Sequence, residues 1–252
     1  MGMSAIMERY IVSSHCLFFL DYDGTLAELQ KAPENAHLTL AEHTVLRDLC
    51  QKPQNTIVII SGRDRPTLDV WLAGLSLNIA AEYGHFIKES GSDWQVHADR
   101  DPKWKKAIRP VMETVCEIVP GSLVEDKDFS LVWHYRQATT SAGEAAAKTL
   151  VKQLEPLATE LRLTITAANK VVEVMVPGVD KAGVARHWLK KRDWDFILAA
   201  GDSLLDEDLF HAMPKGAFTV KIGSGATGAQ ERLANPHELS GLLNTLNDLC
   251  QT

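Results

Sequence analysis

Short apolar runs alternate with amphipathic segments over the first third of the chain. The apolar runs at residues 17–20, 57–60 and 78–81 predict β-strands, and apolar residues at helical spacing predict helices at 38–50 and 66–75. The last third repeats the pattern, with strands predicted at 196–200 and 218–222 and helices at 184–191, 206–212 and 236–249. Such alternation is typical of a parallel sheet covered on both faces by helices, so we predict an α/β fold with a doubly wound parallel-sheet core.

The middle of the chain has a different order of elements. Helices are predicted at 103–119 and 141–158, and hairpins at 122–135 and at 161–176, the second turning across Ala168 and Asn169. This order indicates a separate antiparallel sheet backed by two helices. Breakers cluster at Asp101 and Pro102 and again at Pro177 and Gly178. We therefore expect a core of residues 1–101 and 178–252, with residues 102–177 as an inserted α/β domain.

Composition and charge narrow the class of protein. The 252 residues are 45% hydrophobic and 23% charged, which is ordinary for a globular enzyme. The net charge of −7 disfavours nucleic acid or an anionic membrane as a partner, because both attract basic surfaces. No apolar run approaches the roughly 20 residues that span a bilayer, and the first residues lack a signal-peptide pattern. We expect a cytoplasmic protein with reduced cysteines, since the four are scattered (Cys16, Cys50, Cys116 and Cys250).

Two carboxylates directly follow the first predicted strand. Asp21 and Asp23 stand two residues apart, and Gly24 permits the turn that points them in the same direction. Such a pair suits attack on phosphorus and proton exchange with a leaving oxygen. The alternative is an ordinary Asp–Gly turn or helix cap.

Polar groups also follow other strands of the outer block. Ser61 and Gly62 come after the second strand, where a hydroxyl and backbone N–H groups can cradle an anion, although Ser–Gly is also a plain turn signal. Lys181 precedes a predicted helix and has the charge to neutralise phosphoryl oxygens, but most lysines are solvated surface groups. The carboxyl ends of parallel strands line one crevice, so we expect these groups to converge there.

The last segment with candidate chemistry follows the strand at 196–200. Asp202 offers an oxygen ligand of the kind that Mg²⁺ prefers, opposite Asp21. Asp206 is placed to orient a metal-bound water or Lys181. Acidic residues at a helix start also arise simply from the helix dipole, and that alternative stays open here.

Taken together and in this order, these segments resemble the trehalose-6-phosphate phosphatase family of the haloacid dehalogenase (HAD) superfamily. The matching stretches cover nearly the whole chain: FLDYDGTL at 19–26, ISGR at 60–63, AEYGH at 81–85, EDKDFSLVWHYR at 125–136, NKVVEVMVPGVDK at 169–181 and GDSLLDEDLF at 201–210. The resemblance implies a HAD-like Rossmannoid core with an inserted α/β cap of the C2 type, and a partnership with a trehalose-phosphate synthase.

The resemblance also implies roles for individual residues. Asp21 is the nucleophile that forms an aspartyl-phosphate, Asp23 is the acid and base, and Lys181 and Asp206 complete the catalytic set. Asp21, the carbonyl of Asp23, and Asp202 bind Mg²⁺. The implied substrate-binding residues come from both the core and the cap (Thr25, Ser61, Gly62, Arg63, His85, Glu125, Lys127, His134, Arg136 and Glu173). For the cap residues, cross-strand pairing on an exposed hairpin is the alternative.

The chain departs from the family pattern at the last motif. Ser203 and Leu205 replace an Asp and a Thr of the usual GDD-x-TDED, and Ala182 replaces the Gly that usually follows the lysine. A missing carboxylate makes the surroundings of a metal less negative. The expected function is a Mg²⁺-dependent phosphatase of trehalose 6-phosphate. The alternatives are a phosphatase of another sugar phosphate and a non-catalytic protein that binds a sugar phosphate.

Overall fold

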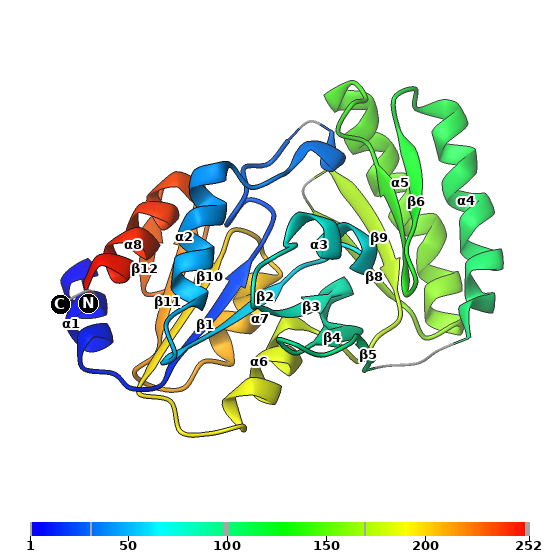
Figure 1. The fold of residues 1–252 in the computed structure, drawn as a ribbon. Helices are drawn as coiled ribbons and strands as arrows, with labels where there is room; N and C mark the ends of the chain where they lie inside the picture. The colour runs from blue at the N-terminus through cyan, green and yellow to red at the C-terminus, as the bar shows by residue number, and fades with distance from the viewer. Residues whose placement is uncertain (1, 31, 98–100, 169, 250–252) are drawn as a thin grey trace. The chain divides into compact units, whose positions relative to one another are not determined.

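A computed structural model describes residues 2–30, 32–97, 101–168 and 170–249. The chain divides into two compact units (Figure 1). The core unit comprises Met1–Gln30, Ala36–His97 and Asp180–Thr252, and the insert unit comprises Lys31–Asn35 and Ala98–Val179. Each unit has its own sheet.

The core unit is built on an eight-stranded sheet of order β12-β11-β10-β1-β2-β3-β4-β5. The strands from β12 to β3 pair in parallel, and β4 and β5 are antiparallel. Their bounds are β1 Cys16–Asp21, β2 Asn55–Ile60, β3 Asn78–Ala81, β4 Phe86–Lys88, β5 Gln95–Val96, β10 Phe196–Gly201, β11 Phe218–Ile222 and β12 Glu231–Leu233. The order of strands along the chain reverses between β1 and β10, and the carboxyl ends of strands at such a switch point line the usual ligand crevice of an open α/β sheet.

Helices cover the core sheet on both faces (Figure 1). They are α1 Met3–Ile11, α2 Leu40–Cys50, α3 Arg65–Trp71, α6 Lys181–Leu189, α7 Asp206–His211 and α8 Pro236–Leu249. Every residue of β1 is buried, because alternate side chains serve the two faces. Phe18 packs edge-on against Tyr10 of α1, whereas Phe19 belongs to a cluster with Trp188 of α6. The predicted α/β fold with a parallel-sheet core is confirmed.

The insert unit has a four-stranded antiparallel sheet of order β6-β7-β9-β8, with two long helices packed against it. Its elements are η1 Pro33–Asn35, η3 Pro102–Trp104, α4 Lys105–Ile118, β6 Leu123–Asp126, β7 Ser130–His134, α5 Thr140–Glu160, β8 Thr164–Ala168 and β9 Val171–Met175. Tyr135, stacked on buried Trp133, lies against Gly143 of α5. The alternating residues of the opposite face are mostly polar, among them Ser130 and Glu173.

Several elements begin or end elsewhere than the sequence predicts. Helix α2 begins at Leu40, because Thr39 and Glu42 form a capping box. Helix α6 begins at Lys181 instead of residue 184, because the side chain of Asp180 accepts from the backbone N–H of Gly183. Helix α1, strands β4, β5 and β12, and the short 3-10 turns at Pro33–Asn35 and Glu82–Gly84 were not predicted. The predicted turn residue Asn169 and Cys250 lie outside the described residues, and the other cysteines are free thiols.

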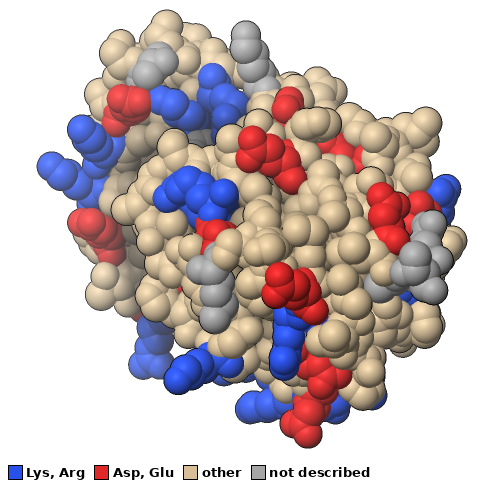
Figure 2. Space-filling model, turned by 90° about the vertical axis from the view of Figure 1, so that its left-hand side faces the viewer, with Lys and Arg blue, Asp and Glu red and all other residues tan. Residues whose placement is uncertain are grey.

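The surface carries charges of both signs. On the face shown in Figure 2, acidic and basic side chains are interspersed among neutral ones. No helix in the described part of the chain is both long and apolar enough to cross a membrane.

Candidate active site

The chain turns sharply where β1 ends at Asp21. The carbonyl of Tyr22 accepts from the N–H groups of Leu26 and Ala27, each at 2.9 Å, and Gly24 donates to the carbonyl of Ala27 at 2.7 Å. Gly24 has φ +81°, and a Cβ built on it lies 2.2 Å from Oδ2 of Asp202. Glycine is therefore required at position 24 for two reasons: the backbone is in the left-handed region, and Asp202 leaves no room for a Cβ atom.

Lys181 lies between two buried carboxylates. Its Nζ is 2.6 Å from Oδ1 of Asp21 and 2.6 Å from Oδ1 of Asp206, and the second oxygen of Asp21 accepts from the hydroxyl of Thr25 at 2.9 Å. Burial alone lowers the pKa of Lys181, but Asp206 and Asp21 outweigh it, so that the pKa is raised. The lysine therefore remains charged at neutral pH.

Asp206 is held by the segment that precedes it. Its Oδ2 accepts from the backbone N–H of Ser203 at 2.8 Å and from the Ser203 hydroxyl at 2.7 Å. A Cβ on Gly201 lies 2.2 Å from the carboxyl carbon of Asp206, so only glycine fits at the end of β10. Because Lys181 and Ser203 occupy its oxygens, Asp206 is suited to position Lys181.

Asp21, Asp202 and Asp206 form an acidic cluster, with one oxygen from each within 4.8 Å of the others. Burial raises the pKa of Asp21, and the neighbouring carboxylates add to this against the opposing charge of Lys181. Burial and Asp206 raise the pKa of Asp202 to about 6. Among the described residues, no hydrogen-bond donor reaches the carboxylate of Asp202. Crowded, incompletely paired carboxylate oxygens fit a hard divalent cation.

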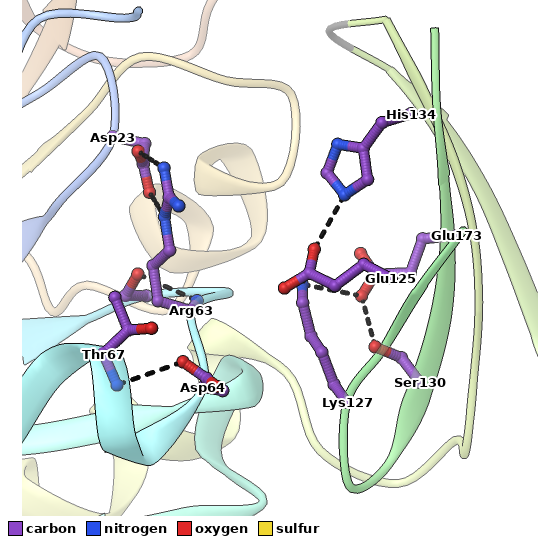
Figure 3. A network of polar contacts seen from close by, with 10 residues as sticks. Asp23, Arg63, Asp64, Thr67, Glu125, Lys127, Ser130, His134 and Glu173 are labelled. Atoms are coloured by element: carbon purple, nitrogen blue, oxygen red, sulfur yellow. Dashed lines mark hydrogen bonds and ion pairs between the residues drawn. The ribbon is translucent and has the colours of Figure 1, made fainter. Parts of the chain in front are cut away.

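The loop after β2 lies at the same end of the sheet. Ser61 is buried, and its hydroxyl accepts from the N–H of Arg63 at 3.1 Å. The Arg63 guanidinium forms a bidentate pair with Asp23, from Nε to Oδ2 at 2.8 Å and from Nη2 to Oδ1 at 2.6 Å (Figure 3). A Cβ on Gly62 lies 2.5 Å from the hydroxyl of Tyr83, so the loop passes too close to Tyr83 for a side chain at this position.

The turn Glu82–Gly84, named η2, supports this loop. The N–H of Tyr83 donates to the carbonyl of Ser61, and that of Glu82 donates to the carbonyl of Arg63, each at 3.0 Å. Glu82 and Tyr83 have positive φ values of 46° and 59°, a conformation that costs energy in non-glycine residues. His85 is buried, with Nδ1 2.7 Å from the carbonyl oxygen of Glu82.

The insert unit brings together most of the polar residues that the sequence singles out there. Nε2 of His134 lies 2.7 Å from Oε2 of Glu125, and the hydroxyl of Ser130 donates to Oε1 of Glu173 at 2.7 Å (Figure 3). Nζ of Lys127 lies 3.6 Å from the same oxygen of Glu173. Ser130 and Glu173 are each only 3% exposed. Arg136 lies in the turn after β7.

The profile of the family described as trehalose-phosphatase matches residues 19–251. The chain belongs to the trehalose-phosphatase family. Two curated relatives are the bifunctional trehalose-6-phosphate synthase/phosphatase of Thermoproteus tenax, 36% identical over 91% of this chain, and the trehalose-phosphatase of Saccharomyces cerevisiae, 33% identical over 96%. The chain covers 32% of each, so it spans about a third of the length of these relatives.

Solved structures share the fold of this chain. The C-terminal domain of C. albicans trehalose-6-phosphate phosphatase superposes with a TM-score of 0.93 at 29% identity, covering 100% of this chain and 99% of that one. A haloacid dehalogenase-like hydrolase from B. subtilis shares the fold, with a TM-score of 0.60 at 16% identity over 90% of this chain and 98% of that one.

Some residues that contact the predicted site residues were not themselves predicted. Buried Lys221 in β11 donates from Nζ to the backbone carbonyl of Asp202. A lysine inside the apolar strand FTVKI was a usable signal, because lysine is almost never fully buried without a partner. Ser130, which donates to Glu173, gave no such signal, since serine occurs widely in strands without a functional role.

Proposed function

We propose that this chain is a cytoplasmic Mg²⁺-dependent phosphatase that hydrolyses a sugar phosphate, with trehalose 6-phosphate as the first candidate. The observation that carries the proposal is the buried contact of Lys181 with Asp21, at the carboxyl end of the central strand. A buried carboxylate beside a fixed cation is prepared to meet a phosphoryl group. Membership of the trehalose-phosphatase family supports the choice of substrate.

The proposed reaction has two steps. An oxygen of Asp21 attacks phosphorus, the bond from phosphorus to the sugar oxygen breaks, and an aspartyl-phosphate forms. Asp23 gives a proton to the departing sugar oxygen and then takes one from the water that attacks the aspartyl-phosphate, which releases phosphate and restores Asp21.

The remaining core residues hold charge and position. Ser61 and Lys181 bind phosphoryl oxygens, with Thr25 and Gly62 beside them, while Asp206 fixes the direction of the Lys181 side chain. Asp21, Asp202 and the carbonyl of Asp23 would hold Mg²⁺. When bound, the ion supplies positive charge that stabilises the phosphoryl oxygens during transfer.

The insert unit is proposed to select the sugar. Glu125, Lys127 and Glu173 offer charged hydrogen-bonding groups on one sheet, and sugars are recognised by their hydroxyl groups. Arg63, His85, His134 and Arg136 are the further candidates. Two curated relatives that match this chain are named for trehalose-phosphate synthase activity. We therefore also propose that a synthase is the functional partner that supplies the substrate.

A panel of sugar phosphates, assayed by phosphate release with Mg²⁺ or a chelator, tests this proposal. We expect trehalose 6-phosphate to be turned over faster than sucrose phosphate, hexose phosphates and p-nitrophenyl phosphate, and only with Mg²⁺. If another sugar phosphate were turned over faster, trehalose 6-phosphate would be the wrong substrate, whereas the proposed phosphatase mechanism would still hold.

Replacing the nucleophile separates an enzyme from a binding protein. The Asp21→Asn variant should lose turnover by at least ~10³-fold while still binding substrate. A wild-type chain that binds trehalose 6-phosphate but releases no phosphate would instead favour the regulatory alternative.

A further inference from the structure

An aromatic cluster lies beneath the Arg63 side chain. Trp71, the last residue of α3, has its ring 4.8 Å from the Arg63 guanidinium carbon. The same ring stacks on Tyr22, with centroids 5.4 Å apart and planes at 29°, and His37 meets it edge-on at 4.7 Å. Trp71 therefore joins the arginine to Tyr22, the residue between the two aspartates of the first motif.

The edge of the guanidinium is held as well. Its two bonds to Asp23 use both carboxylate oxygens, so the plane of the carboxylate follows the plane of the guanidinium. The backbone of Arg63 is held at its N–H by Ser61 and at its carbonyl by Glu82. The long side chain between backbone and guanidinium has rotamer entropy to lose, so a contact on the face of the guanidinium helps to define its conformation.

We propose that Trp71 is a positioning residue of the reaction: its ring fixes the plane of the Arg63 guanidinium, which in turn fixes the carboxylate of Asp23. This inference rests on the proposed function, because it assigns Trp71 a part in the acid–base step. Tryptophan is the strongest aromatic partner for a cation, and stacking on Tyr22 fixes the ring relative to the aspartate loop. A carboxylate that transfers a proton must meet the ester oxygen at hydrogen-bonding distance and in a defined direction.

Comparing two substrates reveals this role. The alkoxide that leaves a sugar phosphate needs a proton, whereas p-nitrophenolate is stable enough to leave without one. The Trp71→Met variant keeps an apolar side chain but has no aromatic face. We expect its kcat/KM for trehalose 6-phosphate, which reports the step that forms the aspartyl-phosphate, to fall about tenfold, part of the ~10²- to 10⁴-fold that acid–base catalysis supplies. The kcat/KM for p-nitrophenyl phosphate should change less than twofold, because its leaving group needs no proton in that step.

Matched variants isolate the cause. Trp71→Phe retains a ring and should keep most of the activity. Trp94→Met is the control, because Trp94 also lies near a cation and a carboxylate of the core unit, Lys88 at 5.5 Å and Asp69 at 2.8 Å, outside the acidic cluster. It should leave the ratio of the two substrates unchanged. If Trp71→Met does not fold, Arg63→Lys removes the bidentate guanidinium while keeping the positive charge. The same difference between the two substrates is then expected.

A double-mutant cycle completes the test. Trp71 acts through Arg63, so adding Trp71→Met to Arg63→Lys should lower kcat/KM for trehalose 6-phosphate no further. Fully additive losses, or an equal loss of kcat/KM with both substrates, would overturn the proposal and leave Trp71 as a packing residue. A wild-type chain that turns over neither substrate would contradict the proposed function itself, which is a distinguishable result.

Discussion

Lys181 and Asp21 lie 160 positions apart in the sequence, yet their side chains are 2.6 Å apart and buried. Removing the lysine leaves Asp21 and Asp206 without their shared cation. Breaking a buried ion pair from one side costs roughly 3–5 kcal/mol, so Lys181→Met should lower the free energy of unfolding by that order and abolish phosphate release.

An exposed pair provides the control for Lys181. Lys191→Met removes the partner of Glu89, and exposed pairs contribute at most about 1 kcal/mol. Chemical denaturation of both variants measures the difference. Equal losses of stability would contradict the idea that Lys181 compensates a buried cluster.

Gly24→Ala should harm the protein more than its backbone angle alone predicts. A left-handed residue other than glycine costs about 1–2 kcal/mol, and here the new methyl group also meets the carboxylate of Asp202. Gly74→Ala is the matched control, with the same φ of +81° and no atom within 4 Å of the added carbon. We expect only Gly24→Ala to weaken Mg²⁺ binding, measured by calorimetry. If Gly24→Ala and Gly74→Ala had the same effect on stability and on Mg²⁺ binding, the carboxylate of Asp202 would be free to move away from the new methyl group.

The raised pKa of Asp202 predicts how stability depends on pH. Its carboxyl ionises near 3.8 when unfolded and near 6 when folded, so the folded state binds the proton more tightly. As pH rises through this window without a divalent cation, the folded state loses stability, on the order of a few kcal/mol. Above pH 6 this stabilisation is gone.

Mg²⁺ should reverse that trend, because the ion needs the ionised carboxylate. Thermal unfolding below, at and above pH 6 should show a gain from Mg²⁺ that grows with pH. In the Asp202→Asn variant, both the loss of stability with rising pH and the stabilisation by Mg²⁺ should be smaller. A gain from Mg²⁺ that is independent of pH would contradict Asp202 as a ligand.

Ser130→Ala tests whether the buried Glu173 matters for substrate binding. The substitution removes a donor 2.7 Å from a carboxylate that is 3% exposed, at a cost of about 1–3 kcal/mol. We expect KM for trehalose 6-phosphate to rise several-fold and p-nitrophenyl phosphate turnover to stay the same. Ser122→Ala, which loses only a bond to the carbonyl of Val119, is the control. A KM unchanged in Ser130→Ala would leave this hydrogen bond a purely structural role.

Periodicity was sufficient to predict central strands such as β1 and β10 and most helices, because strands buried on both faces are nearly continuous apolar runs. The short strands β4, β5 and β12 were missed, because two or three residues are too few to show a period. Helix ends depended on individual caps such as Asp180, whose effect moved the start of α6 to Lys181. The convergence of Asp21, Lys181 and Asp206 was predictable, because the carboxyl ends of parallel strands line one edge of the sheet. Pairings such as Arg63 with Asp23 were out of reach, because a sequence does not say which side chain a long, flexible arginine will meet.

The departure at Ser203 has a local explanation in the structure. Its hydroxyl donates to Asp206, a bond that an ionised aspartate at this position has no proton to make. Ser203 therefore makes the surroundings of the proposed metal site less negative, and it also adds a hydrogen bond that restrains the Asp206 carboxylate.

The pairing of β1 with β10 also bears on how the protein folds. Residues 16–20 pair with residues 196–200, so the middle of the core sheet joins segments from opposite ends of the chain. Long-range pairing of this kind is slow to form. During synthesis, one edge of the apolar strand LFFL stays unpaired until residues 196–200 have been made. An unpaired strand edge of this kind is prone to aggregation. The carboxylates of Asp21 and Asp202 thus come together late, and a truncated chain that ends before β10 is expected to be both inactive and poorly soluble.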